Sequence, residues 1–260
     1  MEAVALTIAG SDPSGGAGIQ ADLKTFHQFG VYGEAAITLI TVQNTRRLER
    51  LHCLEAGLVA GQIRAVIEDI RPHAAKTGAL GGVDIVEAVA AEARAFDFPL
   101  VVDPVMISKH GSALIADDAR QALKTLLLPL AFLLTPNLAE AAVLARMPGV
   151  TDLAGMRQAA QRIAALGPRA VLVKGGHLAG DAVDVLYSNG QWREFSAPRI
   201  VTRHTHGTGC TYSAAITAEL ARGTPLGDAI GRAKRFVTEA IRTNPGLGGG
   251  NGPLNHRAAW

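Results

Sequence analysis

The chain has 260 residues, of which 48% are hydrophobic and 18% are charged. A chain of this length and composition can bury a large core, and we expect one α/β domain over residues 1–260. Lysine and arginine total 25, aspartate and glutamate total 23, and neither sign forms a long run. This balance excludes an extended basic surface for nucleic acid or anionic lipid, so the expected partner is a small molecule.

The lack of a recognisable signal peptide or membrane span and the use of cysteine both favour a cytoplasmic protein. The first residues, MEAVALTIAGSD, carry an acid where a signal peptide needs a base. The longest later apolar run, LLLPLAFLL, contains Pro129 and is about half as long as a segment that spans a bilayer. Cys53 and Cys210 match no zinc-binding pattern, which is typical of a reducing compartment. We therefore expect a soluble cytoplasmic chain without a membrane partner.

Short apolar runs alternate with segments of helical period along most of the chain. Ile63, Val66, Ile67 and Ile70 repeat with the spacing of a helix that lies on a sheet. This alternation predicts an α/β three-layer sandwich, in which helices cover both faces of a mostly parallel central sheet. The predicted parallel strands lie near 3–9, 35–42, 74–80, 99–104, 131–137 and 170–176.

Two local signals add to this pattern, an antiparallel hairpin late in the chain and the start of one helix. The segment VDVLYSNGQWREF places Asn189-Gly190 between two alternating stretches, which predicts a two-residue turn and an antiparallel edge. Asn137 precedes Glu140 by three residues, the spacing of a capping box that opens a helix.

Small or polar residues follow each predicted parallel strand. In a parallel sheet these residues lie along one edge, where open α/β folds bind their ligands. Each group alone is ordinary turn or cap chemistry, whereas their convergence favours a ligand site. The groups are Gly10-Ser11-Asp12, Thr41-Val42-Gln43-Asn44, Thr77-Gly78, Asp103-Pro104, Thr135-Pro136-Asn137 and Lys174-Gly175-Gly176.

The expected ligand carries phosphate. Two glycine-rich loops, GSDPSGGAGIQADLKTF and HGTGCTYSA, enter predicted helices, and a helix N-terminus offers unpaired amides to anions. Neither loop is a Walker A motif or a dinucleotide-binding GxGxxG unit. Asp103, Asn137 and Glu140 could supply oxygen ligands to Mg²⁺, while Lys174 could neutralise phosphate. Alternatively, Glu140 only caps a helix and Lys174 only ends a strand in solvent.

These residues resemble the hydroxymethylpyrimidine and phosphomethylpyrimidine kinases of thiamine synthesis, in the ribokinase-like superfamily. The similarity extends over AGSDPSGGAGIQADLKTF, TVQNT, DPVM, TPNLAEA, VLVKGGH, HTHGTGCTYSAAI and GPLNH, in this order along nearly the whole chain. It implies a ribokinase-like fold, a homodimer, and ATP- and Mg²⁺-dependent phosphorylation of 4-amino-5-hydroxymethyl-2-methylpyrimidine and then of its monophosphate.

The resemblance also implies a role for individual residues. Gln43 corresponds to the residue that recognises the pyrimidine, and the other positions expected to bind the substrate are Gly10, Asp22, Val42 and Ala79. The Mg²⁺-nucleotide region corresponds to Asp103, Asn137 and Glu140, and Lys174 corresponds to a phosphate contact. The anion hole corresponds to Gly207, Thr208 and Gly209, which directly precede Cys210, the residue we expect to be catalytic if it does more than fill space.

Three positions depart from the family's usual residues. Val42 replaces a smaller alanine, Ala79 replaces a methionine that walls the pyrimidine pocket, and His204 replaces an asparagine. The extra space at Ala79 leaves a pyridoxal or pyridoxine kinase of the same superfamily as an alternative. A non-catalytic pyrimidine-sensing module is a further alternative, since a fold alone does not fix a function.

Cys210 has two possible explanations. It could fill space beneath a helix as a small buried residue, or it could act in the reaction at the helix N-terminus, which favours thiolate over thiol. The ability to stay neutral would suit a second step whose acceptor is already an ionised phosphate monoester. The nearby His204 and His206 are expected to be loop histidines in solvent. The glycine-rich segment NPGLGGGNGPLNH could be either a loose tail or a lid.

Overall fold

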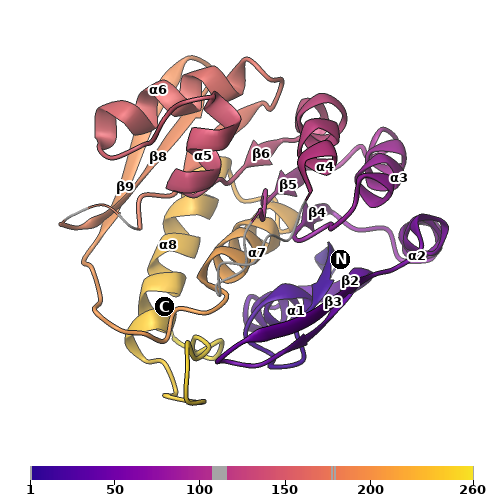
Figure 1. Ribbon diagram of the computed structural model, residues 1–260, viewed down its shortest axis with the longest axis horizontal. Coiled ribbons are helices and arrows are strands. Elements are labelled where there is room, and N and C mark those ends of the chain that lie inside the picture. Colours follow the sequence, from indigo (N-terminus) through magenta and orange to yellow (C-terminus); the bar gives the residue numbers. More distant parts are fainter. Residues whose placement is uncertain (1, 107–115, 177, 179, 260) are drawn as a thin grey trace.

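The computed structural model describes residues 2–106, 116–176, 178 and 180–259. Within these residues, nine strands form one twisted sheet in the order β3-β2-β1-β4-β5-β6-β7-β8-β9 (Figure 1). The strands from β2 to β7 in this order run parallel, and β3, β8 and β9 pair antiparallel at the two ends. Their bounds are β1 Val4–Ser11, β2 Tyr32–Gln43, β3 Leu48–Cys53, β4 Ala74–Thr77, β5 Leu100–Val102, β6 Leu133–Leu134, β7 Ala170–Val173, β8 Ala182–Ser188 and β9 Gln191–Ala197.

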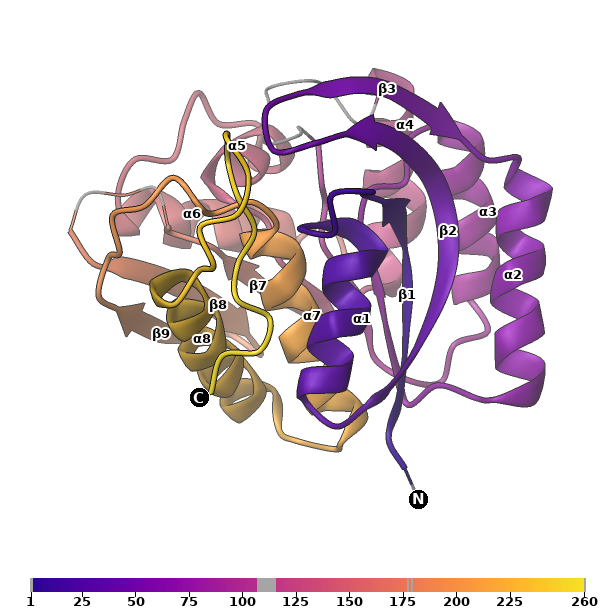
Figure 2. The same cartoon turned by 90° about the horizontal axis from the view of Figure 1, so that it is seen from below.

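Helices cover both faces of the sheet (Figures 1 and 2). One face packs under α1, α7 and α8, and the other packs under α2, α3, α4, α5 and α6. Side chains alternate along β1, so that Ala5 enters the first core and Leu6 and Ile8 enter the second. The helices are α1 Gly18–Gln28, α2 Ala56–Asp69, α3 Val83–Ala93, α4 Asp117–Ala122, α5 Leu138–Ala145, α6 Leu153–Ala164, α7 Thr208–Ala221 and α8 Leu226–Arg242, with short π and 3₁₀ turns at Leu123–Leu127 and Leu128–Leu130.

The predicted three-layer α/β architecture is confirmed, and each predicted parallel strand has a counterpart in the sheet. The predicted hairpin is also present, because β8 and β9 are joined by Asn189 and Gly190 with φ angles of 52° and 74°. Positive φ at both turn positions is the geometry that Asn-Gly favours. Strand β3, which pairs with the end of β2 at the far edge of the sheet, was not predicted from the sequence.

The C-terminal segment after α8 is packed along the edge of the sheet that carries the loops (Figure 2). The Asn251 amide donates to the Thr45 carbonyl (2.8 Å), and the His206 amide donates to the Gly252 carbonyl (3.1 Å). Leu254 is buried, and His256 lies 3.1 Å from the Thr211 hydroxyl. The segment therefore links the β2–β3 turn to the loop before α7.

No helix in the described part of the chain is both long and apolar enough to cross a membrane.

Candidate active site

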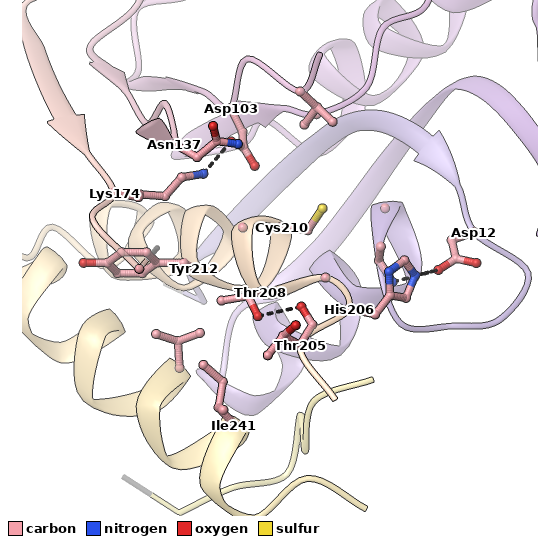
Figure 3. A pocket seen from close by; sticks show the side chains of 18 of the residues that line it. Asp12, Asp103, Asn137, Lys174, Thr205, His206, Thr208, Cys210, Tyr212 and Ile241 are labelled. Atoms are coloured by element: carbon pink, nitrogen blue, oxygen red, sulfur yellow. Dashed lines mark hydrogen bonds and ion pairs between the residues drawn. The ribbon is translucent and has the colours of Figure 1, made fainter. Parts of the chain in front are cut away.

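A pocket of about 740 Å³ lies at the carboxyl edge of the sheet, beside the N-terminal ends of α1 and α7 (Figure 3). Most of the predicted site residues line it, although they come from distant parts of the chain. They are Gly10, Gln43, Ala79, Asp103, Asn137, Glu140, Lys174, Gly207, Thr208, Gly209 and Cys210.

Two residues predicted to contact substrate are not among those that line the pocket. Val42 is 52% exposed, because it points away from the side that carries Thr41 and Gln43 on β2. Asp22 is fully buried behind the pocket, where its Oδ2 accepts from Lys76 Nζ (2.8 Å) and from the Thr7 hydroxyl (2.7 Å). These positions correct the prediction: Val42 and Asp22 do not line the pocket.

The loop before α1 already contains a carboxylate. Asp12 accepts hydrogen bonds from the Ser14 amide (2.9 Å), the Ser14 hydroxyl (2.7 Å) and the Ala17 amide (3.0 Å). The Ser14 and Ala17 amides are therefore occupied by Asp12 and are not available to an anion. The charge of Asp12 would also repel a phosphate group placed beside it.

The loop before α7 is open. The Gly207 φ angle is 78°, and a Cβ there would lie 1.8 Å from the Gly16 carbonyl oxygen, so only glycine fits. Among the described residues, the amides of Gly209 and Cys210 have no hydrogen-bond partner. These free amides at the positive end of a 14-residue helix form an anion-binding position.

A buried ion pair lies next to this helix end. Lys174 Nζ is 3.0 Å from Asp103 Oδ1, and a Cβ on Gly209 would lie 3.3 Å from Lys174 Nζ. Ser213 donates to the other carboxylate oxygen of Asp103 at 3.3 Å. Although burial alone would lower it, the Asp103 and Glu140 carboxylates raise the pKa of Lys174. Lys174 therefore carries a positive charge beside the open amides, and is not a solvated strand end.

Asn137 and Glu140 form the predicted capping box at the start of α5. The Asn137 side chain accepts from the Glu140 amide (2.9 Å), and Glu140 Oε2 accepts from the Asn137 amide (2.8 Å). Burial raises the pKa of Glu140 to about 7, although Lys174 opposes this shift. The capping interpretation is confirmed, and both residues also line the pocket.

The donor set suits a divalent cation only in part. In the part of the chain that the structure describes, no three or more His, Cys, Asp or Glu side chains are grouped to hold a metal. Mg²⁺ in phosphate-transfer sites typically takes one or two carboxylates and completes its shell with water and phosphate oxygens. Asp103 and Glu140 meet this smaller requirement, whereas the Asn137 side-chain oxygen is committed to the helix cap.

Cys210 lies in the pocket wall between the Lys174–Asp103 ion pair and the hydrogen-bonded His206–Asp12 pair (Figure 3). Burial raises the pKa of its thiol to about 11, although the positive charge of Lys76 opposes this shift. The expectation that the helix end favours a thiolate is therefore wrong for the free protein. At neutral pH Cys210 presents a neutral thiol to the pocket.

His206 is buried and paired, contrary to the expectation of a loop histidine in solvent. Its Nε2 atom is 2.7 Å from Asp12 Oδ2 and 3.2 Å from Gln43 Nε2. His204 is half-buried, and its amide donates to the Thr202 hydroxyl (3.2 Å).

A second end of the pocket was not predicted from the sequence. Lys234 on α8 forms a 2.7 Å ion pair with Asp184 and lies 5.9 Å from the centre of the Tyr212 ring. Lys234 falls on the buried face of α8, between Ala233 and Phe236. A charged residue within an apolar helical stripe was the signal that could have indicated it. The apolar part of this wall consists of Ile200, Val201, Val237 and Ile241.

The profile of the phosphomethylpyrimidine kinase family matches residues 12–255. The chain belongs to this family. It is 47% identical to the hydroxymethylpyrimidine/phosphomethylpyrimidine kinase of Streptomyces coelicolor, over 96% of this chain and 93% of that protein. A kinase of the same name from Rhizobium meliloti is 47% identical over 100% of this chain and 99% of its own length.

Other relatives of the phosphomethylpyrimidine kinase family differ in length or in name. A bifunctional thiamine biosynthesis protein of Geobacter sulfurreducens is 48% identical, and the chain spans 51% of it. The structure also resembles an ADP complex of Bacillus subtilis pyridoxal kinase, with a TM-score of 0.92, 40% identity and coverage of 99% and 98% of the two chains. For the phosphomethylpyrimidine kinase of Clostridium difficile the TM-score is 0.82, with 41% identity and coverage of 92% and 100%. The predicted family and ribokinase-like architecture are thus confirmed.

Proposed function

We propose that this kinase transfers phosphate from ATP to 4-amino-5-hydroxymethyl-2-methylpyrimidine, and then phosphorylates the resulting monophosphate to the diphosphate used for thiamine. The observation that carries the proposal is one continuous pocket with Gln43 and Ala79 in one part and the open α7 amides beside Lys174 in another. The relatives named for both activities over nearly their full length support it. A sensing module without catalysis would not need a lysine and free amides at the same point.

The transfer step depends on charge stabilisation at the α7 end. Phosphoryl transfer passes through a loose transition state, so positioning and neutralisation matter more than a strong base. The amides of Gly209 and Cys210 would bind the oxygens of the transferred group, and Lys174 would offset their negative charge. Gly207 and Thr208 shape the turn that exposes these amides, and Thr208 is fixed by its hydroxyl bond to the Thr205 carbonyl (2.8 Å).

Mg²⁺ is expected with ATP, and Asp103 and Glu140 would hold it together with phosphate oxygens and water. The ion would supply positive charge to the phosphates of the donor. Glu140 has a pKa of about 7 in the free protein, so a cation beside it would favour its ionised form.

Cys210 would act as a neutral group near the acceptor. A thiol can accept a weak hydrogen bond from the alcohol in the first step. In the second step the acceptor is a phosphate monoester that is already largely ionised, with a second pKa of about 6. A neutral thiol does not repel this acceptor, whereas a fixed carboxylate would. This difference is our explanation for cysteine at this position.

The nucleotide would extend toward the second end of the pocket. Val201, Val237 and Ile241 offer an apolar wall for a planar base, and the wall continues from α8 to the segment after β9. Lys234 is paired with Asp184, whose other carboxylate oxygen accepts from the Gly175 amide (3.0 Å). This network connects α8 to the loop that carries Lys174.

A pyridoxal kinase activity is the second candidate. It is favoured by Ala79, which lines the pocket where the family usually carries methionine, and by the likeness to the Bacillus subtilis pyridoxal kinase structure. Purified protein should be incubated with Mg-ATP and, in parallel, with the pyrimidine alcohol or with pyridoxal, and the products should be weighed by mass spectrometry. Pyrimidine mono- and diphosphate support the first candidate. Phosphorylation of pyridoxal alone supports the second.

We also propose a cytoplasmic homodimer. Tyr32, Ile40 and Val42 lie on β2 with exposures of 50%, 47% and 52%, a set of apolar side chains that a second copy would cover. Both cysteines are free, which fits a reducing compartment. Light scattering of the purified protein tests the assembly: a dimeric mass supports it, and a monomeric mass at micromolar concentration contradicts it.

A further inference from the structure

The bonding of Asp12 determines which hydrogen bonds are possible around His206. The Ser14 amide, the Ser14 hydroxyl and the Ala17 amide all donate to the Asp12 side chain, which is 4% exposed. A carboxyl group surrounded by donors is stable as a carboxylate, and an ionised carboxylate can only accept. His206 Nε2, 2.7 Å from Asp12 Oδ2, must therefore carry a proton and donate it.

This proton determines the orientation of Gln43. The Gln43 amide nitrogen facing His206 Nε2 at 3.2 Å would bring two donors together. The oxygen and nitrogen of a carboxamide have nearly the same size, so hydrogen-bond partners decide which atom lies where. We propose that His206, held by Asp12, fixes the Gln43 carboxamide with its oxygen toward the imidazole and its NH₂ group toward the pocket.

The imidazole itself is held by the chain on several sides. The His206 amide donates to the Gly252 carbonyl at 3.1 Å, and His206 pairs with Pro253 of the C-terminal segment. A Cβ on Gly16 would lie 2.6 Å from His206 Cδ2, so the loop before α1 also touches the ring. His206 is 4% exposed. The orientation of Gln43 is therefore set by the folded protein before any substrate binds.

The consequence is a rule for the substrate, which rests on the proposed kinase function. Gln43 presents N–H donors, so the ligand atom beside it must be an acceptor such as an unprotonated ring nitrogen. A C–H group or a protonated nitrogen at that position would leave a desolvated donor unpaired. His206 and Asp12 are positioning residues in this scheme, because they act on the ligand through Gln43.

The tautomer of His206 tests the first half of the proposal without any substrate. Two-bond ¹H–¹⁵N correlation spectra of the uniformly labelled protein at pH 7.5 should show the His206 proton on Nε2. In the Asp12→Asn variant this proton should exchange faster with water, because its charged acceptor is gone. An Nε2 atom without a proton in the wild-type protein would overturn the proposal.

Substitution of Gln43 tests the second half. Gln43→Glu can still accept from His206 but cannot donate to a ligand, so its KM for the pyrimidine alcohol should rise about 10-fold or more, as in Gln43→Ala. If Gln43→Glu keeps the wild-type KM, the oxygen faces the ligand and the proposal is wrong.

The histidine variants complete the test. His206→Phe keeps a ring of similar shape without the hydrogen bond, and should raise KM for the pyrimidine alcohol about 10-fold while KM for ATP changes less than about threefold. The matched control is His204→Asn, in the same loop, which should leave both constants near wild type. Equal effects of His206→Phe on both substrates would contradict a role through Gln43. If the wild-type protein phosphorylates no pyrimidine, the proposed function fails, while the tautomer result stands by itself.

Discussion

The loops before α1 and α7 look alike in sequence but differ in what they can bind. Each is rich in glycine and leads into a helix on the same face of the sheet. In the first loop, Asp12 accepts from the Ser14 and Ala17 amides. In the second, the amides of Gly209 and Cys210 have no partner among the described residues, and Lys174 lies beside them. One acidic residue inside the first loop thus occupies two amides, whereas two amides of the second loop remain available to an anion.

The difference assigns separate tasks to the two loops. In the proposed function, the carboxylate before α1 would hold His206 and Gln43 for recognition of the acceptor. The open helix end before α7 would serve phosphate transfer.

Lys174→Ala removes the positive charge beside the open loop. Because this charge would stabilise the transferred phosphate, kcat should fall about 100- to 1,000-fold. Affinity for the pyrimidine alcohol, measured by calorimetry, should change much less. Lys174→Arg, which keeps the charge, is the matched control and should retain more activity than the alanine variant. An unchanged kcat in Lys174→Ala would remove this residue from the transfer step.

Cys210→Asp places a fixed charge at the open loop. The unperturbed pKa of aspartate is about 3.9, so the new carboxylate would be ionised at neutral pH and could accept the proton of the alcohol. The rate of the first step should therefore stay within about 10-fold of wild type. In the second step it would face a phosphate monoester a few ångströms away, a repulsion of several kcal/mol at an effective dielectric of about 20. The second rate should therefore fall about 100-fold, and monophosphate should accumulate.

This prediction is tested by measuring the rates of the two phosphorylations separately, with each acceptor at saturation. The control is Cys210→Ala. The alanine variant tests whether the thiol only fills space, because a small cavity would not change the ratio of the two rates. Equal loss of both steps in Cys210→Asp, or a larger loss in the first, would contradict our explanation of the cysteine.

Asp12→Gly removes the carboxylate from the closed loop. Loss of its buried, charged hydrogen bonds should lower the free energy of unfolding by about 2–4 kcal/mol. The freed amides should then respond to anions, so that sulfate stabilises the variant more than it stabilises the wild type. Urea unfolding with and without sulfate measures both effects. If sulfate has the same effect on both proteins, the Ser14 and Ala17 amides do not form a latent anion site.

Glu140 provides the smallest expected effect, a release of protons. Its folded pKa of about 7 lies above the ordinary value of 4.5, so protonation is favoured in the folded state and this contribution to stability is lost as the pH rises from about 4.5 to 7. A bound Mg-nucleotide should lower this pKa, and binding at pH 7 should release a fraction of a proton. Calorimetry in buffers of different ionisation enthalpy measures this release, and Glu140→Gln should abolish it. Equal release by both proteins would point to another group.

Much of the fold could be predicted because its signals are local. The apolar runs, the Asn189-Gly190 turn and the Asn137–Glu140 cap each depend on residues close together in the chain. The site could be predicted in outline for a similar reason, since parallel strands bring their carboxyl ends to one edge. The alternation of side chains along a strand could also have shown that Val42 faces away from the pocket, because its neighbours Thr41 and Gln43 face into it.

The remainder depends on contacts between distant segments. Asp12 and His206 are 194 positions apart, and the amides bonded to Asp12 cannot be deduced from loop composition. Lys234 meets Asp184 only because α8 packs beside β8 and β9. The protonation state of the Cys210 thiol depends on burial, which raises its pKa by more than the helix N-terminus was expected to lower it.

The most direct test of the account is to locate the phosphate groups in solution. Amide shifts of the ¹⁵N-labelled protein should be followed while Mg²⁺ and a non-hydrolysable ATP analogue are added. We predict large shifts for the Gly209 and Cys210 amides and small shifts for the Ser14 and Ala17 amides, because Ser14 and Ala17 already donate to Asp12 whereas Gly209 and Cys210 have no acceptor among the described residues. Large shifts at Ser14 and Ala17 with unchanged Gly209 and Cys210 would contradict the account.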